Sequence, residues 1–171
     1  MREPLRPFLT ARWSHLIFLT FEAPETVLAP LVPQPCDPDL WEHRGHVSLV
    51  ALRVERLRVY GVPVPGLSSY PQVNLRLYLR HEGLPAVRFV REIVQSRLVA
   101  GAARWWYGEP FVAGRVKCRG SADAEDPSVQ YFFQVGGAHG RIAVQGGAET
   151  TVPDSKTFEH WLTQRVRGCR P

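Results

Sequence analysis

Hydrophobic and polar side chains alternate strictly along the segment "VNLRLYL", from Val73 to Leu79. A period of two predicts a β-strand with one apolar face and one polar face. The next segment, "HEGLP", predicts a turn centred on Gly83, and "AVRFVREIV" predicts a strand that returns beside the first. We expect the apolar face of this hairpin to pack against a helix, and the polar face to line a cavity or meet solvent.

The register of this hairpin decides which polar side chains meet. With the turn centred as expected, Asn74 lies opposite Glu92, and Arg76 lies diagonal to Glu92. A shift of one residue would put Arg91 there instead. An Arg–Glu pair on a cavity wall would be satisfied and could still bind an anionic ligand, whereas on the outer surface it is an ordinary ion pair. Because Tyr78 shares the polar face, the candidate ligand-binding residues are Asn74, Arg76, Tyr78 and Glu92.

The rest of the pattern predicts mostly antiparallel β-structure with about three short helices, an α+β domain. Further strands are expected at Trp13–Phe21, Val47–Tyr60, Phe111–Arg119, Val129–Val135 and Arg141–Gln145. Helices are expected in "APETVLAPLVP", from Gln95 or Ser96 to Trp106, and in "SKTFEHWLTQRV". The last of these should have Ser155 as its N-cap and bury the stripe Phe158, Trp161, Leu162 and Val166. A chain of 171 residues fits a single domain, residues 1–171, with a real core.

The basic residues are spread along the whole chain. All but two of the 21 are arginines, and the net charge is +5. Arginine suits phosphate and carboxylate partners, but these arginines form no run of five or six. The sequence therefore favours a solvated surface over nucleic acid binding, although an interaction module for an acidic partner stays open.

Cysteine usage and hydropathy indicate a cytoplasmic protein. Cys36, Cys118 and Cys169 are odd in number and widely spaced, as expected of reduced thiols. The apolar run "LIFLTF" is too short to span a bilayer, which needs about 20 apolar residues. The segment "EHRGH" places His43 and His46 downstream of Cys36, but without the further ligands of a zinc motif, so no metal and no cofactor are expected.

Several segments together resemble a known family in the same order. They are "PFLTARWSHLIFLTFEAPETVLAPLVP", "HVSLVALRV", "VNLRLYLR", the Arg-Glu-Ile of "VREIV", and "TFEHWLTQRV". This set resembles the YqjF-like family of bacterial proteins, which is similar in fold to acetoacetate decarboxylase. The resemblance implies an antiparallel β-cone or barrel around a small-molecule cavity.

The resemblance also implies what this chain lacks. Acetoacetate decarboxylases follow their Arg-Glu-Ile with a Lys-Lys pair that supplies the Schiff-base amine. Here "VQSRLV" puts Arg97 and Leu98 near that position, and a guanidinium is not a nucleophile. Lys117 alternates with arginines on an expected solvent face, and Asn74 replaces a carboxylate. Schiff-base decarboxylation is therefore not expected.

The chain also ends soon after "FEHWLTQRV", where YqjF-like chains continue. We expect the closing strands of the family to be absent, and self-association into a homo-oligomer to cover the exposed edge.

Three functions remain open, and whether the protein is an enzyme is left undecided. The first is a binding protein for a small anionic or amphipathic organic molecule, without membrane attachment. The second is a lyase or hydrolase that uses Glu92 as acid and base and Arg76 as an anion clamp. The third is the interaction module for an acidic partner, which a continuous positive face would favour.

Overall fold

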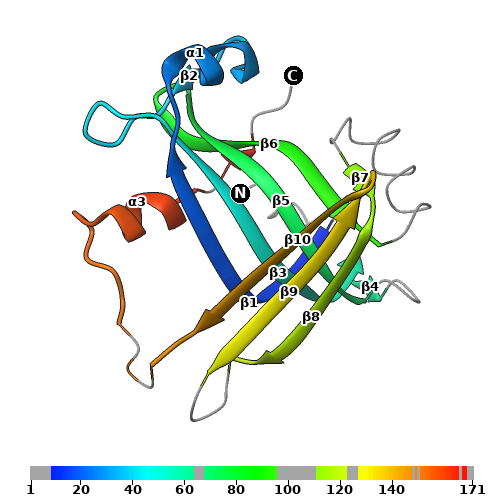
Figure 1. The fold of residues 1–171 in the computed structure, drawn as a ribbon. Helices are drawn as coiled ribbons and strands as arrows, with labels where there is room; N and C mark the ends of the chain where they lie inside the picture. Colours follow the sequence, from blue (N-terminus) through cyan, green and yellow to red (C-terminus); the bar gives the residue numbers. More distant parts are fainter. Residues whose placement is uncertain are drawn as a thin grey trace, which may run out of the picture.

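A computed structural model of the chain describes residues 9–63, 68–95, 111–122, 127–147, 149, 151–165 and 167–168. Within these residues the chain forms two β-sheets (Figure 1). The strands of the larger sheet are β1 (Leu9–Glu22), β2 (Asp37–Pro38), β3 (His46–Val59), β4 (Val62–Pro63), β5 (Ser69–His81), β6 (Leu84–Val94), β7 (Phe111–Ala113) and β11 (Arg167–Gly168). The smaller sheet consists of β8 (Arg115–Ser121), β9 (Ser128–Val135) and β10 (Ala138–Gln145).

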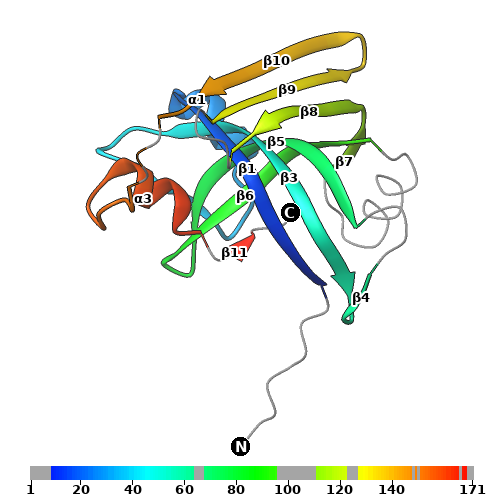
Figure 2. The same cartoon turned by 90° about the horizontal axis from the view of Figure 1, so that it is seen from below.

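The main path through the larger sheet is β1-β3-β5-β6-β11, and the smaller sheet has the order β10-β9-β8. The pairs among β1, β3, β5 and β6 are antiparallel, while β7 and β11 pair with β6 in parallel. The predicted mainly β architecture is confirmed. In the described part of the chain it takes the form of two open sheets rather than a closed barrel (Figure 2).

The apolar face of the β5–β6 hairpin packs against the smaller sheet at one end and against a short helix at the other. Val73 and Ile93 lie in one buried cluster with Val116 of β8 and Tyr131 of β9. Further along the same face, Leu77 and Leu79 pack with Leu28 of a short helix. The expectation that a helix would cover this face is therefore confirmed at Leu77 and Leu79 and wrong at Val73, where the smaller sheet covers it.

The hairpin turn is centred between Glu82 and Gly83, where His81 pairs with Leu84, and not on Gly83 as predicted. Glu82 and Gly83 have φ angles of 51° and 77°, as a two-residue turn with both central residues in the left-handed region requires. Asn74 pairs with Glu92 as predicted. A register shift between Leu75 and Arg76 then makes Arg76 the partner of Phe89, which the strict alternation did not reveal.

The helices in the described residues are short. They are α1 (Glu25–Leu28), the 3-10 turn η1 (Ala29–Leu31) and α3 (Phe158–Thr163). The cap of α3 is Thr157, whose hydroxyl accepts a hydrogen bond from the His160 N–H at 3.3 Å, and not Ser155 as expected. The helix predicted from Gln95 or Ser96 to Trp106, and Val166 of the predicted stripe, lie outside the described residues. Among the described helices, none is long and apolar enough to cross a membrane.

Cys36 takes part in a disulfide whose partner lies outside the described residues. The expectation of three reduced thiols is thereby corrected for this residue. The Cys36 side chain is buried beside Leu77 and Leu79, so the cross-link is anchored in the core under α1. Cys118 carries a free thiol.

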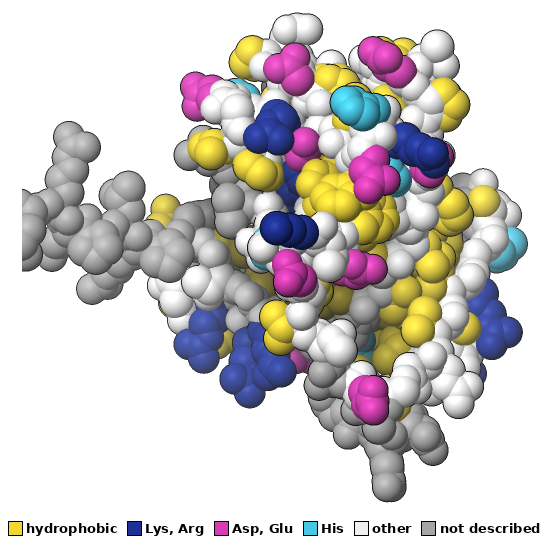
Figure 3. Space-filling model, turned by 90° about the vertical axis from the view of Figure 1, so that its left-hand side faces the viewer, with side chains coloured by type: hydrophobic (Ala, Val, Ile, Leu, Met, Phe, Trp, Pro, Cys, Tyr) yellow, Lys and Arg dark blue, Asp and Glu magenta, His cyan; other side chains and the backbone are white. Residues whose placement is uncertain are grey.

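Large apolar side chains are exposed near the free edges of the two sheets. Trp13, Leu16 and Phe21 on β1 and Val144 on β10 are each at least 40% exposed. Figure 3 shows apolar side chains gathered in the hollow on this side of the molecule. Self-association through this region stays a prediction.

Candidate functional site

The four predicted site residues lie on one face of the larger sheet. Asn74, Arg76 and Tyr78 alternate along β5, and Glu92 projects from β6 opposite Asn74. All four are buried: Asn74 is 2% exposed, Arg76 6%, Tyr78 3% and Glu92 4%. We call this set the polar wall. Buried polar groups in this number must be satisfied internally or by a ligand.

Arg76 is held by aromatic rings and by a backbone carbonyl. Its Cζ lies 4.5 Å from the ring centroid of Phe18 and 5.3 Å from that of Tyr78. Its Nη2 donates to the carbonyl oxygen of Leu162 at 3.1 Å, and its Nε donates to the Tyr78 hydroxyl at 3.4 Å. None of the carboxylates in the described residues lies within ion-pair distance of this guanidinium. A buried cation without a carboxylate partner is unusual and favours an anion in that position.

The expected ion pair between Arg76 and Glu92 is not formed. Glu92 instead accepts a hydrogen bond from Nε2 of Gln72, its neighbour on β5. The register shift after Leu75 moves Arg76 away from the diagonal position that an unshifted ladder would give it. The wall therefore has a cationic end at Arg76 and an acidic end at Glu92.

Hydroxyl groups connect the cationic end to the neighbouring strands. The Tyr78 and Ser48 hydroxyls share a hydrogen bond of 2.5 Å, and the Ser48 hydroxyl shares another of 2.7 Å with Thr20. Sequence reasoning missed Ser48 and Thr20, although both stand in alternating positions of apolar strands. At the acidic end, burial raises the pKa of Tyr70, and the negative charge of Glu92 raises it further. Tyr70 thus remains a neutral phenol at physiological pH.

Asn74 has an unused acceptor. Its Oδ1 is buried and has no hydrogen-bond partner among the described residues. Leaving a buried amide oxygen unpaired costs about 1–3 kcal/mol, so such a group is a natural place for a ligand donor.

The helix α3 covers one end of the polar wall. Tyr78, Val87 and Leu162 share a buried cluster with Phe158 and Trp161. Because Leu162 also accepts the hydrogen bond of Arg76, the helix both covers this guanidinium and helps to orient it. The smaller sheet lies on the opposite face of the larger one (Figure 2).

A buried ion cluster fixes α3 to the sheet. Asp39, which is 5% exposed, accepts from Arg165 just after α3 and from Arg80 of β5 at 3.2 Å. The Arg165 side chain is 2% exposed and its Cζ lies 4.4 Å from the Trp161 ring centroid. Asp39 and Arg165 are 126 positions apart, and no local motif signalled their pairing.

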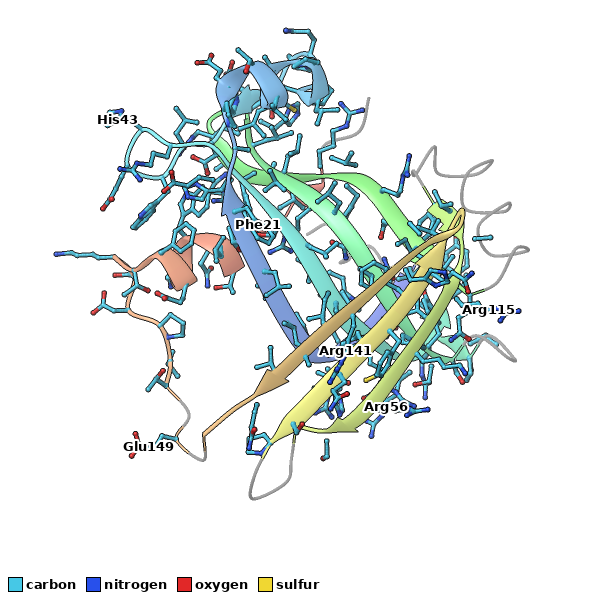
Figure 4. The ribbon with its side chains drawn as sticks, viewed as in Figure 1. Phe21, His43, Arg56, Arg115, Arg141 and Glu149 are labelled. Atoms are coloured by element: carbon cyan, nitrogen blue, oxygen red, sulfur yellow. The ribbon has the colours of Figure 1, made fainter. Side chains whose placement is uncertain are left out.

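A separate open pocket of about 590 Å³ lies beside α1 and the end of β1. It contains none of the four predicted residues. Its rim includes His43 (Figure 4) and an exposed ion pair, in which Arg44 Nη1 donates to Glu22 Oε1 at 2.7 Å. Because Arg44 and Glu22 face solvent and already pair with each other, we regard the polar wall as the better candidate site.

The residues considered for zinc do not converge. The His46 ring is buried among Phe158 and Trp161, and its Nδ1 donates a hydrogen bond of 3.0 Å to the Arg44 carbonyl oxygen. Across the described ranges, no group of three His, Cys, Asp or Glu side chains could hold a metal ion.

The fold is similar to that of acetoacetate decarboxylase. The structure of that enzyme from Legionella pneumophila matches with a TM-score of 0.55 at 14% identity, over 75% of this chain and 45% of the other. An acetoacetate decarboxylase-like enzyme from Sphingomonas wittichii matches with a TM-score of 0.60 at 14% identity, over 86% of this chain and 58% of that enzyme. The enduracididine biosynthesis enzyme MppR, in complex with pyruvate, matches with a TM-score of 0.60 at 14% identity, over 82% of this chain and 58% of MppR.

The chain belongs to the DUF2071 family of uncharacterized conserved proteins, which it matches over residues 10–170. It is 26% identical over 157 residues to the uncharacterized protein YqjF of Bacillus subtilis, which confirms the YqjF-like resemblance. The match covers 91% of this chain and 64% of YqjF, so the chain spans less than two thirds of that relative.

Neither lysine offers a Schiff-base amine on the polar wall. Lys117 lies on the outer face of β8, and Lys156 precedes α3; both are exposed. The positions of Arg97 and Leu98, near the family's lysine pair, lie outside the described residues.

Proposed function

We propose that the protein binds a small organic carboxylate on the polar wall, with the carboxylate against Arg76. The observation that carries this proposal is the burial of the Arg76 guanidinium without a carboxylate partner in the described residues. A bound carboxylate would supply the missing charge through charge-assisted hydrogen bonds.

The aromatic neighbours of Arg76 define the shape of the ligand. Phe18 and Tyr78 lie against the guanidinium, and their flat rings favour a planar group over a bulky one beside it. Asn74 stands two residues from Arg76, about 6.6 Å along the strand, and its Oδ1 would accept from a ligand donor. We therefore infer a short acid with a hydroxyl group near its carboxylate. The pyruvate complex of MppR, whose fold is similar, supports a small organic acid in a fold of this kind.

Calorimetric titration with three compounds of the same length tests this proposal. We expect butanoate to bind, 3-hydroxybutanoate to bind about tenfold tighter because its hydroxyl pairs with Asn74, and neutral butanamide not to bind measurably. The carboxylate-free control isolates the role of charge. Equal binding of butanoate and butanamide would contradict the proposal.

A further inference from the structure

The smaller sheet has an outer face with an unusual charge pattern. Arg115, Lys117 and Arg119 are exposed at alternate positions of β8, and Arg141 is exposed on β10. The sequences of β8, β9 and β10 contain no aspartate or glutamate. We call these four residues and the Phe132 between them the basic face. Figure 4 shows Arg115 and Arg141 projecting away from the sheet.

The strand register brings the charges together around Phe132. Phe132 of β9 pairs with Lys117 on one side and with Arg141 on the other. The Cζ atoms of Arg119 and Arg141 lie 5.6 Å and 5.7 Å from the Phe132 ring centroid. Gln130 accepts a hydrogen bond from Arg141 Nη2 at 3.2 Å, which orients that side chain on the surface. The arginines are scattered along the sequence, but the fold gathers three of them with Lys117 on one surface.

We propose that the basic face binds single-stranded nucleic acid. The three cations of β8 repeat about every 6.6 Å along an extended strand, a spacing that suits successive phosphates of an extended chain. Phe132 and its flanking guanidiniums offer a flat surface on which an unpaired base can stack. An acidic protein would use the charges but not the ring, which favours nucleic acid. The acidic run "DAED" after β8 lies outside the described residues.

Fluorescence anisotropy with labelled dT12 and rU12 tests this proposal. We expect micromolar binding at 50 mM salt and about 50-fold weaker binding at 200 mM. The reason is that each of four neutralised phosphates contributes about −0.7 to the slope of log affinity against log salt concentration. Phe132→Ala should weaken binding about tenfold through lost stacking, with a smaller change in the salt slope. The paired change Lys117→Glu with Arg119→Glu should abolish binding.

A charge-matched control separates this surface from general attraction to a basic protein. Arg12→Glu with Arg58→Glu makes the same change in net charge at exposed positions of the larger sheet. This control should keep at least half of the affinity for dT12. The proposal is overturned if the control loses affinity as fully as the paired change on β8. It is also overturned if Phe132→Ala has no effect, or if polyglutamate or duplex DNA binds as tightly as dT12.

Discussion

The substitution Asp39→Asn is expected to destabilise the protein by about 3–5 kcal/mol. Asp39 is the carboxylate partner of Arg165, whose side chain is 2% exposed, and it also pairs with Arg80. Neutralising it leaves the Arg165 charge buried beside Tyr78 and Trp161 without an opposite charge. The expected result is a large drop in the free energy of unfolding, measured by urea denaturation followed by tryptophan fluorescence.

The exposed pair of Arg44 and Glu22 provides the matched control. Both side chains are more than half exposed, so Glu22→Gln should change the free energy of unfolding by no more than about 1 kcal/mol. Equal effects of the two substitutions would show that the Asp39 cluster is solvated and does not fix α3. Because α3 supplies the carbonyl that orients Arg76, Asp39→Asn should also weaken carboxylate binding.

The substitution Arg76→Met should weaken butanoate binding about 100-fold or more. Methionine keeps much of the apolar volume against Phe18 but removes the charge that the carboxylate requires. Stability should change little, since an apolar side chain replaces a buried charge that has no carboxylate partner in the described residues.

Calorimetric titration of the Arg76→Met variant with butanoate measures this effect, and Arg12→Met on exposed β1 is the control for loss of one arginine. Wild-type affinity in the Arg76 variant would place the carboxylate elsewhere on the protein.

The hairpin that carries the polar wall was predictable because its information is local. Strict alternation from Val73 to Leu79 sets which side chains share a face, and the turn at Gly83 sets the register. By themselves, the observed turn and the alternation would place Asn74 opposite Arg91; the extra residue of β6 at the register shift brings Glu92 opposite Asn74 instead. The alternation and the turn could not reveal the register shift after Leu75, because the extra residue lies on β6 and the sequence of β5 stays strictly alternating.

The long-range features could not be predicted from the sequence. The pairing of Asp39 with Arg165 depends on the course of the whole chain between them, and neither residue stands in a motif. The partner of the apolar face was also undetermined, because Val73 and Leu77 would fit a helix or a sheet equally well. The family resemblance predicted the fold class, but it did not predict that the described strands form two open sheets.

Crystallography can test directly whether a carboxylate binds against Arg76. Crystals of the protein grown with 4-bromobutanoate test it directly, because anomalous diffraction locates the bromine without reference to any assumed pose. We expect a bromine peak on the polar wall, with carboxylate density in hydrogen-bond contact with the Arg76 guanidinium. A peak only in the pocket beside His43, with no density against Arg76, would contradict this expectation.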